Sequence, residues 1–195
     1  MNTKHRFNID KTSGAWDGDI VNKHYHDNNL CQSLINIFKQ NNIKNVLDLG
    51  CGIGKYSKAF IDNNIVCNCY DGHPDTNLLT NNLCDTIDLS KPISLKKTYD
   101  CVLSLEVGEH IPQIYENNFI NNIVNHSHNL IIISWAVPGQ PGDGHVNCKT
   151  NDYIIDRIEK YNFYFNETMT QTLRGHSSLW WFKNTIMFFQ KTKPY

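Results

Sequence analysis

Apolar residues recur along this chain in short runs that alternate with helical patterns. The near-continuous apolar runs that predict strands are NVLDL (45–49), IVCNCY (65–70), YDCVLSL (99–105) and NLIIISWA (129–136). Apolar residues at helical spacing between and around them predict helices over 27–40, 56–62, 113–125 and 150–161. This alternation predicts an α/β fold: a doubly wound, mostly parallel sheet with helices on both faces.

The ends of the chain and one connection are less regular. A short helix is predicted around 75–80, followed by a brief extended segment, LCDTID. FYFNETM and KNTIMFFQK are predicted to be two late strands without a helix between them, so the last strand pair should be antiparallel. Residues 1–26 are polar and are expected to be a flexible segment or a lid, and residues 27–195 a single domain.

Composition and charge disfavour several classes of function. The chain of 195 residues carries 18 Lys and Arg against 19 Asp and Glu, so no basic surface for long nucleic acid is indicated. No apolar run approaches the roughly 20 residues of a membrane span. The seven cysteines form no CxxC pair and the N-terminus has no apolar signal region, which fits a reducing cytoplasm.

A glycine-rich turn follows the first predicted strand. Gly50, Gly52 and Gly54 let the chain turn sharply into a helix whose N-terminus can bind an anionic group. The dinucleotide pattern GxGxxG fails, because Ser57 stands where its third glycine should be. The spacing DxGxGxG, with Asp48 leading, resembles motif I of the class I S-adenosylmethionine-dependent methyltransferases, whose fold has a seven-stranded sheet.

The resemblance implies where the cofactor would bind. Asp71, at the end of the second strand, would accept the ribose hydroxyls, and Asp88 with Leu89 would hold the adenine, although Asp85 competes for that role. Asp48 lies at a buried strand end and needs a partner, either the cofactor's ammonium group or a loop N–H. The full set implied is Asp48, Gly50, Cys51, Gly52, Gly54, Asp71, Asp88, Leu89, Glu106 and Val107.

The segment LEVGEHIP, after the fourth strand, offers candidate catalytic groups. Transfer of a methyl group to an alcohol needs a base or a metal ion to remove the hydroxyl proton. Glu109, His110 and the later His145 are the catalytic candidates, and together with Glu106 they could hold Mg²⁺ or Mn²⁺. A similar ExxEH pattern with a distant His occurs in small-RNA terminal 2′-O-methyltransferases. The alternatives are that His110 or His145 is a simple general base, or that these residues are structural.

These observations predict an S-adenosylmethionine-dependent methyltransferase that modifies a hydroxyl of a small polar or glycan acceptor, such as a sugar. An RNA ribose 2′-O-methyltransferase is the second hypothesis, which the balanced charge disfavours. A non-catalytic cofactor-binding module that supports a partner enzyme is the third. The sequence does not indicate the oligomeric state.

Overall fold

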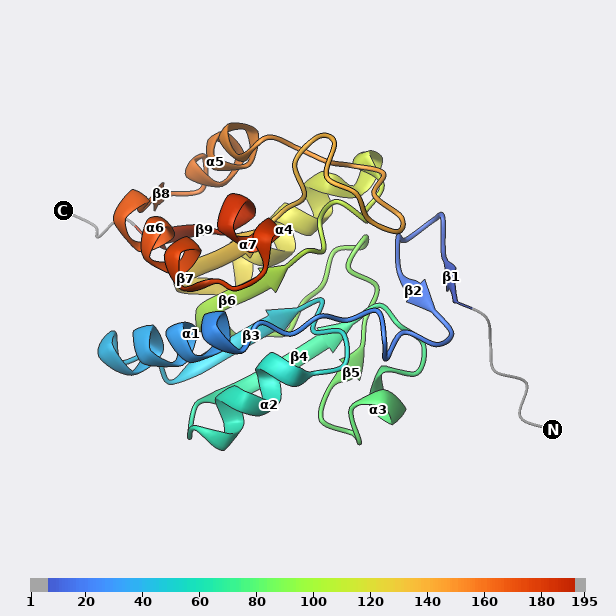
Figure 1. Cartoon of the computed structure of the whole chain (residues 1–195), viewed down its shortest axis with the longest axis horizontal. Coiled ribbons are helices and arrows are strands. Elements are labelled where there is room, and N and C mark those ends of the chain that lie inside the picture. The colour runs from blue at the N-terminus through green and yellow to red at the C-terminus, as the bar shows by residue number, and fades with distance from the viewer. Residues whose placement is uncertain (1–6, 192–195) are drawn as a thin grey trace.

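A seven-stranded mixed sheet forms the centre of the computed structural model, which describes residues 7–191 (Figure 1). Residues 1–6 of the predicted N-terminal segment and 192–195 of the predicted domain lie outside the described residues. The strand order is β5-β4-β3-β6-β7-β9-β8. The strands are β3 (Asn45–Leu49), β4 (Val66–Asp71), β5 (Asp85–Thr86), β6 (Tyr99–Leu105), β7 (Ser127–Ser134), β8 (Phe163–Phe165) and β9 (Met187–Lys191).

The pairing confirms the predicted fold class. β5, β4, β3, β6 and β7 run parallel, whereas β9 is antiparallel to both β7 and β8. From β3 the chain first adds β4 and β5 on one side of the sheet and then crosses to add β6 and β7 on the other side. In doubly wound sheets a crevice lies at this switch point, at the carboxyl ends of β3 and β6. Ligands of doubly wound sheets bind at such a point.

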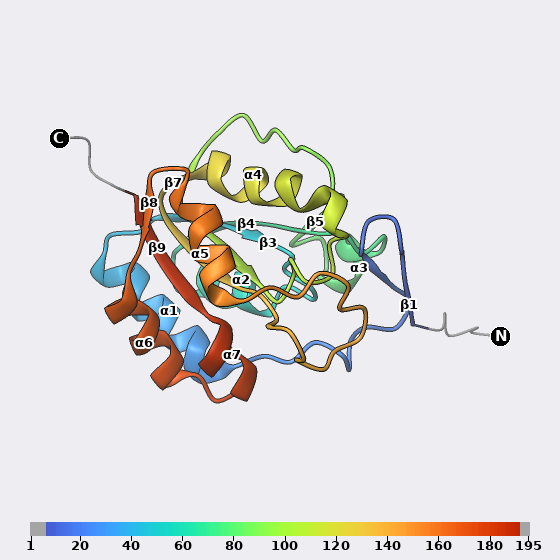
Figure 2. The same cartoon turned by 90° about the horizontal axis from the view of Figure 1, so that it is seen from above.

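Helices cover both faces of the sheet (Figure 2). On one face lie α1 (Asn28–Gln40), α2 (Lys55–Asp62), α6 (Glu167–His176) and α7 (Trp180–Thr185). On the other lie α4 (Glu116–His126), preceded by the short helix η1 (Gln113–Tyr115), and α5 (Asn151–Glu159). Side chains of successive strand residues point to opposite faces of the sheet. Val46 packs in the core under α1 and α2, and Leu47 in the core under α4 and α5. The short helix α3 (Thr76–Leu79) precedes β5.

The C-terminal region differs from the sequence prediction. Two helices, α6 and α7, separate β8 from β9, so the late strands are not consecutive elements. The Asn166 side chain accepts the Met169 N–H at 3.0 Å and begins α6 where a strand was expected to continue. Residues 183–185, which were predicted to begin the last strand, lie in α7, where the Trp181 carbonyl accepts the Thr185 hydroxyl.

The N-terminal segment packs against the carboxyl edge of the sheet. It contains a small hairpin of β1 (Asn8–Ile9) and β2 (Trp16–Asp17). Gly14 has φ +82°, and a Cβ there would lie 2.1 Å from the His110 carbonyl oxygen, so only glycine permits this approach. Asp27 caps α1 and also accepts the N–H groups of Ser178 and Leu179, at 2.6 and 2.9 Å.

A disulfide joins Cys69 in β4 to Cys84 just before β5, with 4.8 Å between the Cα atoms. No sequence pattern indicated this disulfide. A disulfide does not support the reducing cytoplasm expected from the sequence, and that location stays a prediction. Within residues 7–191, no helix is long and apolar enough to cross a bilayer.

Candidate functional site

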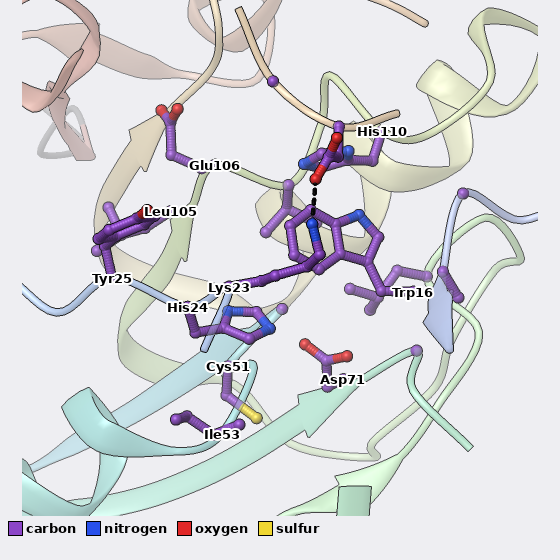
Figure 3. A pocket seen from close by; sticks show the side chains of 18 of the residues that line it. Trp16, Lys23, His24, Tyr25, Cys51, Ile53, Asp71, Leu105, Glu106 and His110 are labelled. Carbon is purple, nitrogen blue, oxygen red and sulfur yellow. Dashed lines mark hydrogen bonds and ion pairs between the residues drawn. The ribbon is translucent and has the colours of Figure 1, made fainter. Parts of the chain in front are cut away.

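A cavity of about 1060 Å³ lies at the carboxyl ends of the parallel strands. Its walls come from the glycine turn after β3, the ends of β4 and β6, the loop after β7, the start of α7 and the N-terminal segment. Figure 3 shows Asp71 and Cys51 on one side of this cavity and Glu106 and His110 across from them. The volume is at the upper end of the range typical of small-ligand sites.

The glycine turn has the backbone that its sequence predicts. Gly50, Gly52 and Gly54 all have positive φ, from 55° to 84°, and Gly54 stands directly before α2. The Asp71 carboxylate accepts the Gly52 N–H at 2.7 Å and the His73 N–H at 2.9 Å. Asp71 therefore fixes the turn against the end of β4 while its carboxylate faces the cavity (Figure 3).

Most of the predicted cofactor residues line this one cavity. They are Asp48, Gly50, Cys51, Asp71, Asp88, Leu89, Glu106 and Val107. Gly52 lies under the His24 ring, and Gly54 packs against Cys84 beneath the turn. Asp88 lines the cavity, whereas Asp85 is exposed and accepts the Asn77 amide, so the geometry favours Asp88 for the adenine end.

Asp48 is almost fully buried in β3, at 4% exposure. Burial raises the pKa of its carboxyl to about 7, and a 2.5 Å hydrogen bond from the Ser57 hydroxyl opposes this rise. The structure supplies the Ser57 hydroxyl as one partner, and the ammonium partner that the sequence suggested stays a prediction. Near neutral pH the residue is therefore divided between its acid and its carboxylate forms.

The loops after β6 and β7 bring three predicted catalytic residues together. One ligand atom from each of Glu109, His110 and His145 lies within 4.8 Å of the others. Both Glu109 oxygens are buried and accept no hydrogen bond from any group between residues 7 and 191. Among the described residues, the nearest basic nitrogen is His145 Nε2, which lies 4.0 Å from Glu109 Oε1. A buried carboxylate facing two imidazoles is a donor set that fits a divalent metal ion.

Glu106 does not join that group of three, although the sequence suggested it as a fourth ligand. Its carboxylate accepts hydrogen bonds from the Gln140 amide at 2.7 Å and from the Thr185 hydroxyl at 3.2 Å. Its backbone has φ +54°, a conformation that costs free energy for a residue with a side chain. Glu106 is therefore held by the loop after β7 and by α7, at the wall of the cavity.

Burial changes the acid–base behaviour of this group. It raises the pKa of Glu109 well above its usual range, with the Glu106 charge adding to the effect. It lowers the pKa of His110 to about 4, with His145 contributing. A neutral imidazole at physiological pH suits a metal ligand or a proton acceptor. A His110 base would consequently be active well below pH 6, and the rise through pH 6 to 7 expected of an ordinary histidine does not apply to it.

A second network holds the loop that carries His145. Glu116, at the start of α4, is nearly buried and accepts the Tyr153 hydroxyl at 2.6 Å and the Asn147 amide at 3.1 Å. Lys149 lies 3.4 Å from the same carboxylate. The Asn147 N–H in turn donates to the Glu109 carbonyl. These contacts tie the loop after β7 to the loop after β6, so His145 is kept beside Glu109.

The N-terminal segment, expected to be a flexible segment or a lid, supplies residues that line the cavity. The Trp16 ring stacks edge-on against His110, with 5.3 Å between ring centroids. Trp16 Nε1 and His24 Nε2 are buried, and neither has a hydrogen-bond partner among the described residues. Both residues line the cavity, so a bound ligand could satisfy these atoms. In the sequence these residues stand out as aromatic and histidine side chains in an otherwise polar stretch, a signal that names no ligand.

Solved structures of other proteins share the fold of this chain. No family model and no curated protein matches the sequence. Among solved structures, magnesium protoporphyrin IX methyltransferase (ChlM) from Synechocystis PCC 6803, with bound SAH, is 19% identical with a TM-score of 0.63, over 83% of this chain and 82% of that one. The sugar N-methyltransferase KedS8 from Streptoalloteichus sp ATCC 53650 is 9% identical with a TM-score of 0.69, over 89% and 90%.

CalS10, an amino pentose methyltransferase from Micromonospora echinaspora, is 11% identical with a TM-score of 0.65, over 83% of this chain and 90% of that one. At such identities the likeness establishes the fold. The chain has the fold of the class I S-adenosylmethionine-dependent methyltransferases, as motif I predicted.

Proposed function

We propose that this protein is an S-adenosylmethionine-dependent methyltransferase that modifies a hydroxyl group of a small polar acceptor. The observation that carries the proposal is the convergence of Glu109, His110 and His145 beside a cavity that the glycine turn and Asp71 also line. A hydroxyl is a poor nucleophile until its proton is removed, and these side chains offer groups that can remove it. The solved neighbours include a sugar N-methyltransferase and a porphyrin methyltransferase, so support for a hydroxyl acceptor comes from this site alone.

The residues present fit the cofactor. The positive-φ glycines allow close backbone approach, and the Asp71 carboxylate is placed to accept ribose hydroxyls. When bound, S-adenosylmethionine supplies an electrophilic methyl group. The protein's own part is to orient the acceptor, to exclude water with Trp16 and His24, and to hold the hydroxyl proton at an imidazole or carboxylate of the Glu109 group.

We further propose that Glu109, His110 and His145 hold Mg²⁺ or Mn²⁺. The support is the buried Glu109 carboxylate without a hydrogen-bond partner in the described chain, together with two imidazole rings 5.1 Å apart. A divalent cation at this position would lower the pKa of an acceptor hydroxyl. The alternative is that one of the two histidines acts alone as the base.

The decisive test is turnover. The protein is incubated with S-adenosylmethionine and panels of sugars, polyols, amines and short RNA, and release of S-adenosylhomocysteine is measured. Methylation of a hydroxyl-bearing small molecule supports the proposal. Transfer to RNA alone would favour the ribose methyltransferase hypothesis, and cofactor binding without any turnover would favour a supporting module.

Cofactor affinity should depend on the ionisation of Asp48. The pKa of this carboxyl is raised to about 7 in the free protein, and the ammonium group of S-adenosylhomocysteine favours the ionised form. Binding should therefore release a proton near pH 6.5, and affinity should rise between pH 5.5 and 7.5 by up to about tenfold per pH unit. Calorimetry in two buffers of different ionisation enthalpy measures the proton. Asp48→Asn should bind S-adenosylhomocysteine without releasing a proton. Equal heats for the native protein in both buffers would show that binding is not coupled to the ionisation of Asp48.

Residues 7–26 should close over the bound cofactor. Trp16 and His24 line the cavity, and Lys23 forms an ion pair with Asp143 across it (Figure 3). Saturating S-adenosylhomocysteine should slow tryptic cleavage after Lys23, because ligand contacts stabilise the closed segment. Cleavage after Lys96, in an exposed loop far along the chain, is the control and should not change. Equal rates at Lys23 with and without ligand would make the segment an ordinary tail.

A further inference from the structure

Three aromatic side chains form a corner at one end of the cavity. Tyr25 and Trp180 each stand steeply against Trp181, at interplanar angles of 73° and 88°, with ring centroids 5.6 and 5.7 Å apart. All three line the cavity. We name these residues the aromatic corner.

Two of the three rings of the aromatic corner are exposed to solvent. Tyr25 is 69% exposed and Trp180 49%, whereas Trp181 is anchored against the core beneath α7. Large aromatic rings exposed side by side are costly in water and are typical of binding surfaces. Figure 3 shows Tyr25 on the same side of the cavity as Leu105 and Glu106, away from Trp16. The corner thus lies at the opposite end of the cavity from the ring of His110.

The charge of the cavity indicates what this corner binds. Apart from Asp48 and Glu106, whose pKa values burial raises, its lining carboxylates are those of Asp10, Asp17, Asp71, Asp88 and Asp143. The Lys side chains that line it are Lys23 and Lys55, and Lys23 is already paired with Asp143. An anionic ligand such as a phosphate ester would be repelled by this surplus of negative charge, whereas a cation would be attracted.

Aromatic rings set at steep angles to one another recognise alkylammonium groups, because each ring face carries negative charge density. We propose that the aromatic corner binds an ammonium group of the acceptor, so that the substrate is an organic cation. This inference rests on the proposed methyltransferase function and narrows its substrate class. The acceptor hydroxyl would then extend from the corner, past Glu106, toward the Glu109 group.

Choline and its uncharged isostere 3,3-dimethylbutan-1-ol are suitable probes, since they differ mainly in charge. Both are titrated into the full chain, free and saturated with S-adenosylhomocysteine, with tryptophan fluorescence and calorimetry as readouts. Choline should bind about tenfold more tightly than the isostere. Trp180→Leu should remove that preference and Trp180→Phe should keep most of it. Equal binding of the two probes would overturn the proposal.

The matched control is Tyr164→Leu, which removes a ring of 41% exposure on β8, outside the cavity lining. It should leave choline binding unchanged, and circular dichroism should show that all variants fold. If Trp180→Leu weakens S-adenosylmethionine but neither S-adenosylhomocysteine nor choline, the corner serves the cofactor's sulfonium and the proposal is overturned. Failure of S-adenosylhomocysteine to bind the native chain would instead overturn the methyltransferase function, and the choline titration on the free protein still tests the corner.

Discussion

Asp71→Ala should abolish detectable binding of S-adenosylhomocysteine. The carboxylate is placed to accept two ribose hydroxyls, and it also holds the Gly52 N–H and thereby the shape of the glycine turn. Two hydrogen bonds to a charged group, each worth about 1.5 to 3 kcal/mol, correspond to a loss on the order of 10² to 10⁴ in affinity. Isothermal titration calorimetry with the native protein as reference measures it.

Asp85→Ala is the matched control for that experiment. Asp85 is the neighbouring acid that the sequence left as a competitor, but it is exposed and outside the cavity lining. Its replacement should leave the affinity within about a factor of two, since surface substitutions away from a site have small effects. Unchanged binding in Asp71→Ala would move the ribose contact to another residue, whereas loss in Asp85→Ala would move the adenine site toward β5.

His145→Ala should eliminate Mn²⁺ binding under the metal hypothesis. The loss should exceed the roughly 10- to 100-fold that removal of an outer-shell partner causes, because a ligand atom itself disappears. Electron paramagnetic resonance of Mn²⁺ gives the affinity without any need for a known acceptor. S-adenosylhomocysteine affinity should be nearly unchanged, since His145 lies on the acceptor side of the cavity. Once an acceptor is known, EDTA should stop turnover and Mg²⁺ or Mn²⁺ should restore it.

His176→Ala is a suitable control for the Mn²⁺ experiment. The His176 ring bonds the Ser33 hydroxyl at 3.2 Å, between α6 and α1, so this histidine is remote from the Glu109 group. Its replacement should leave Mn²⁺ affinity intact. Turnover that survives both EDTA and the double change His110→Ala with His145→Ala would defeat the metal and the base hypotheses together. The rate would then come from positioning alone.

The elements that place the cofactor were predictable because their signals are local. The apolar run of β6 matches the structure from Tyr99 to Leu105, and the glycine spacing after β3 required positive φ at each glycine. The place of Asp71 in the cavity wall was predictable because the rule that ligands bind at strand carboxyl ends applies to any doubly wound sheet, and its role toward the cofactor stays a prediction. These features need only neighbouring residues and a fold class to be recognised.

The errors arose where distant contacts decide the local structure. The run KNTIMFFQK suggested a strand from Lys183, but residues 183–185 belong to α7, in which Trp181 packs against the same core as α1. Glu106 was expected among the metal ligands from its spacing to Glu109, and bonds from Gln140 and Thr185 hold it elsewhere. The contacts of Trp16 with His110 join residues too far apart for any periodic pattern to reveal.

Asp27 joins an early segment of the described chain to a late one, so its contacts form in a fixed order during synthesis. This residue begins α1, yet its second carboxylate oxygen binds the N–H groups of Ser178 and Leu179, the former 151 positions later. Tyr25, two residues earlier, meets Trp181 from the same late segment. A ribosome delivers Asp27 before these partners, which follow 151 and 152 positions later. The contacts that hold this end of residues 7–26 can therefore form only after Ser178, Leu179 and Trp181 have been synthesised.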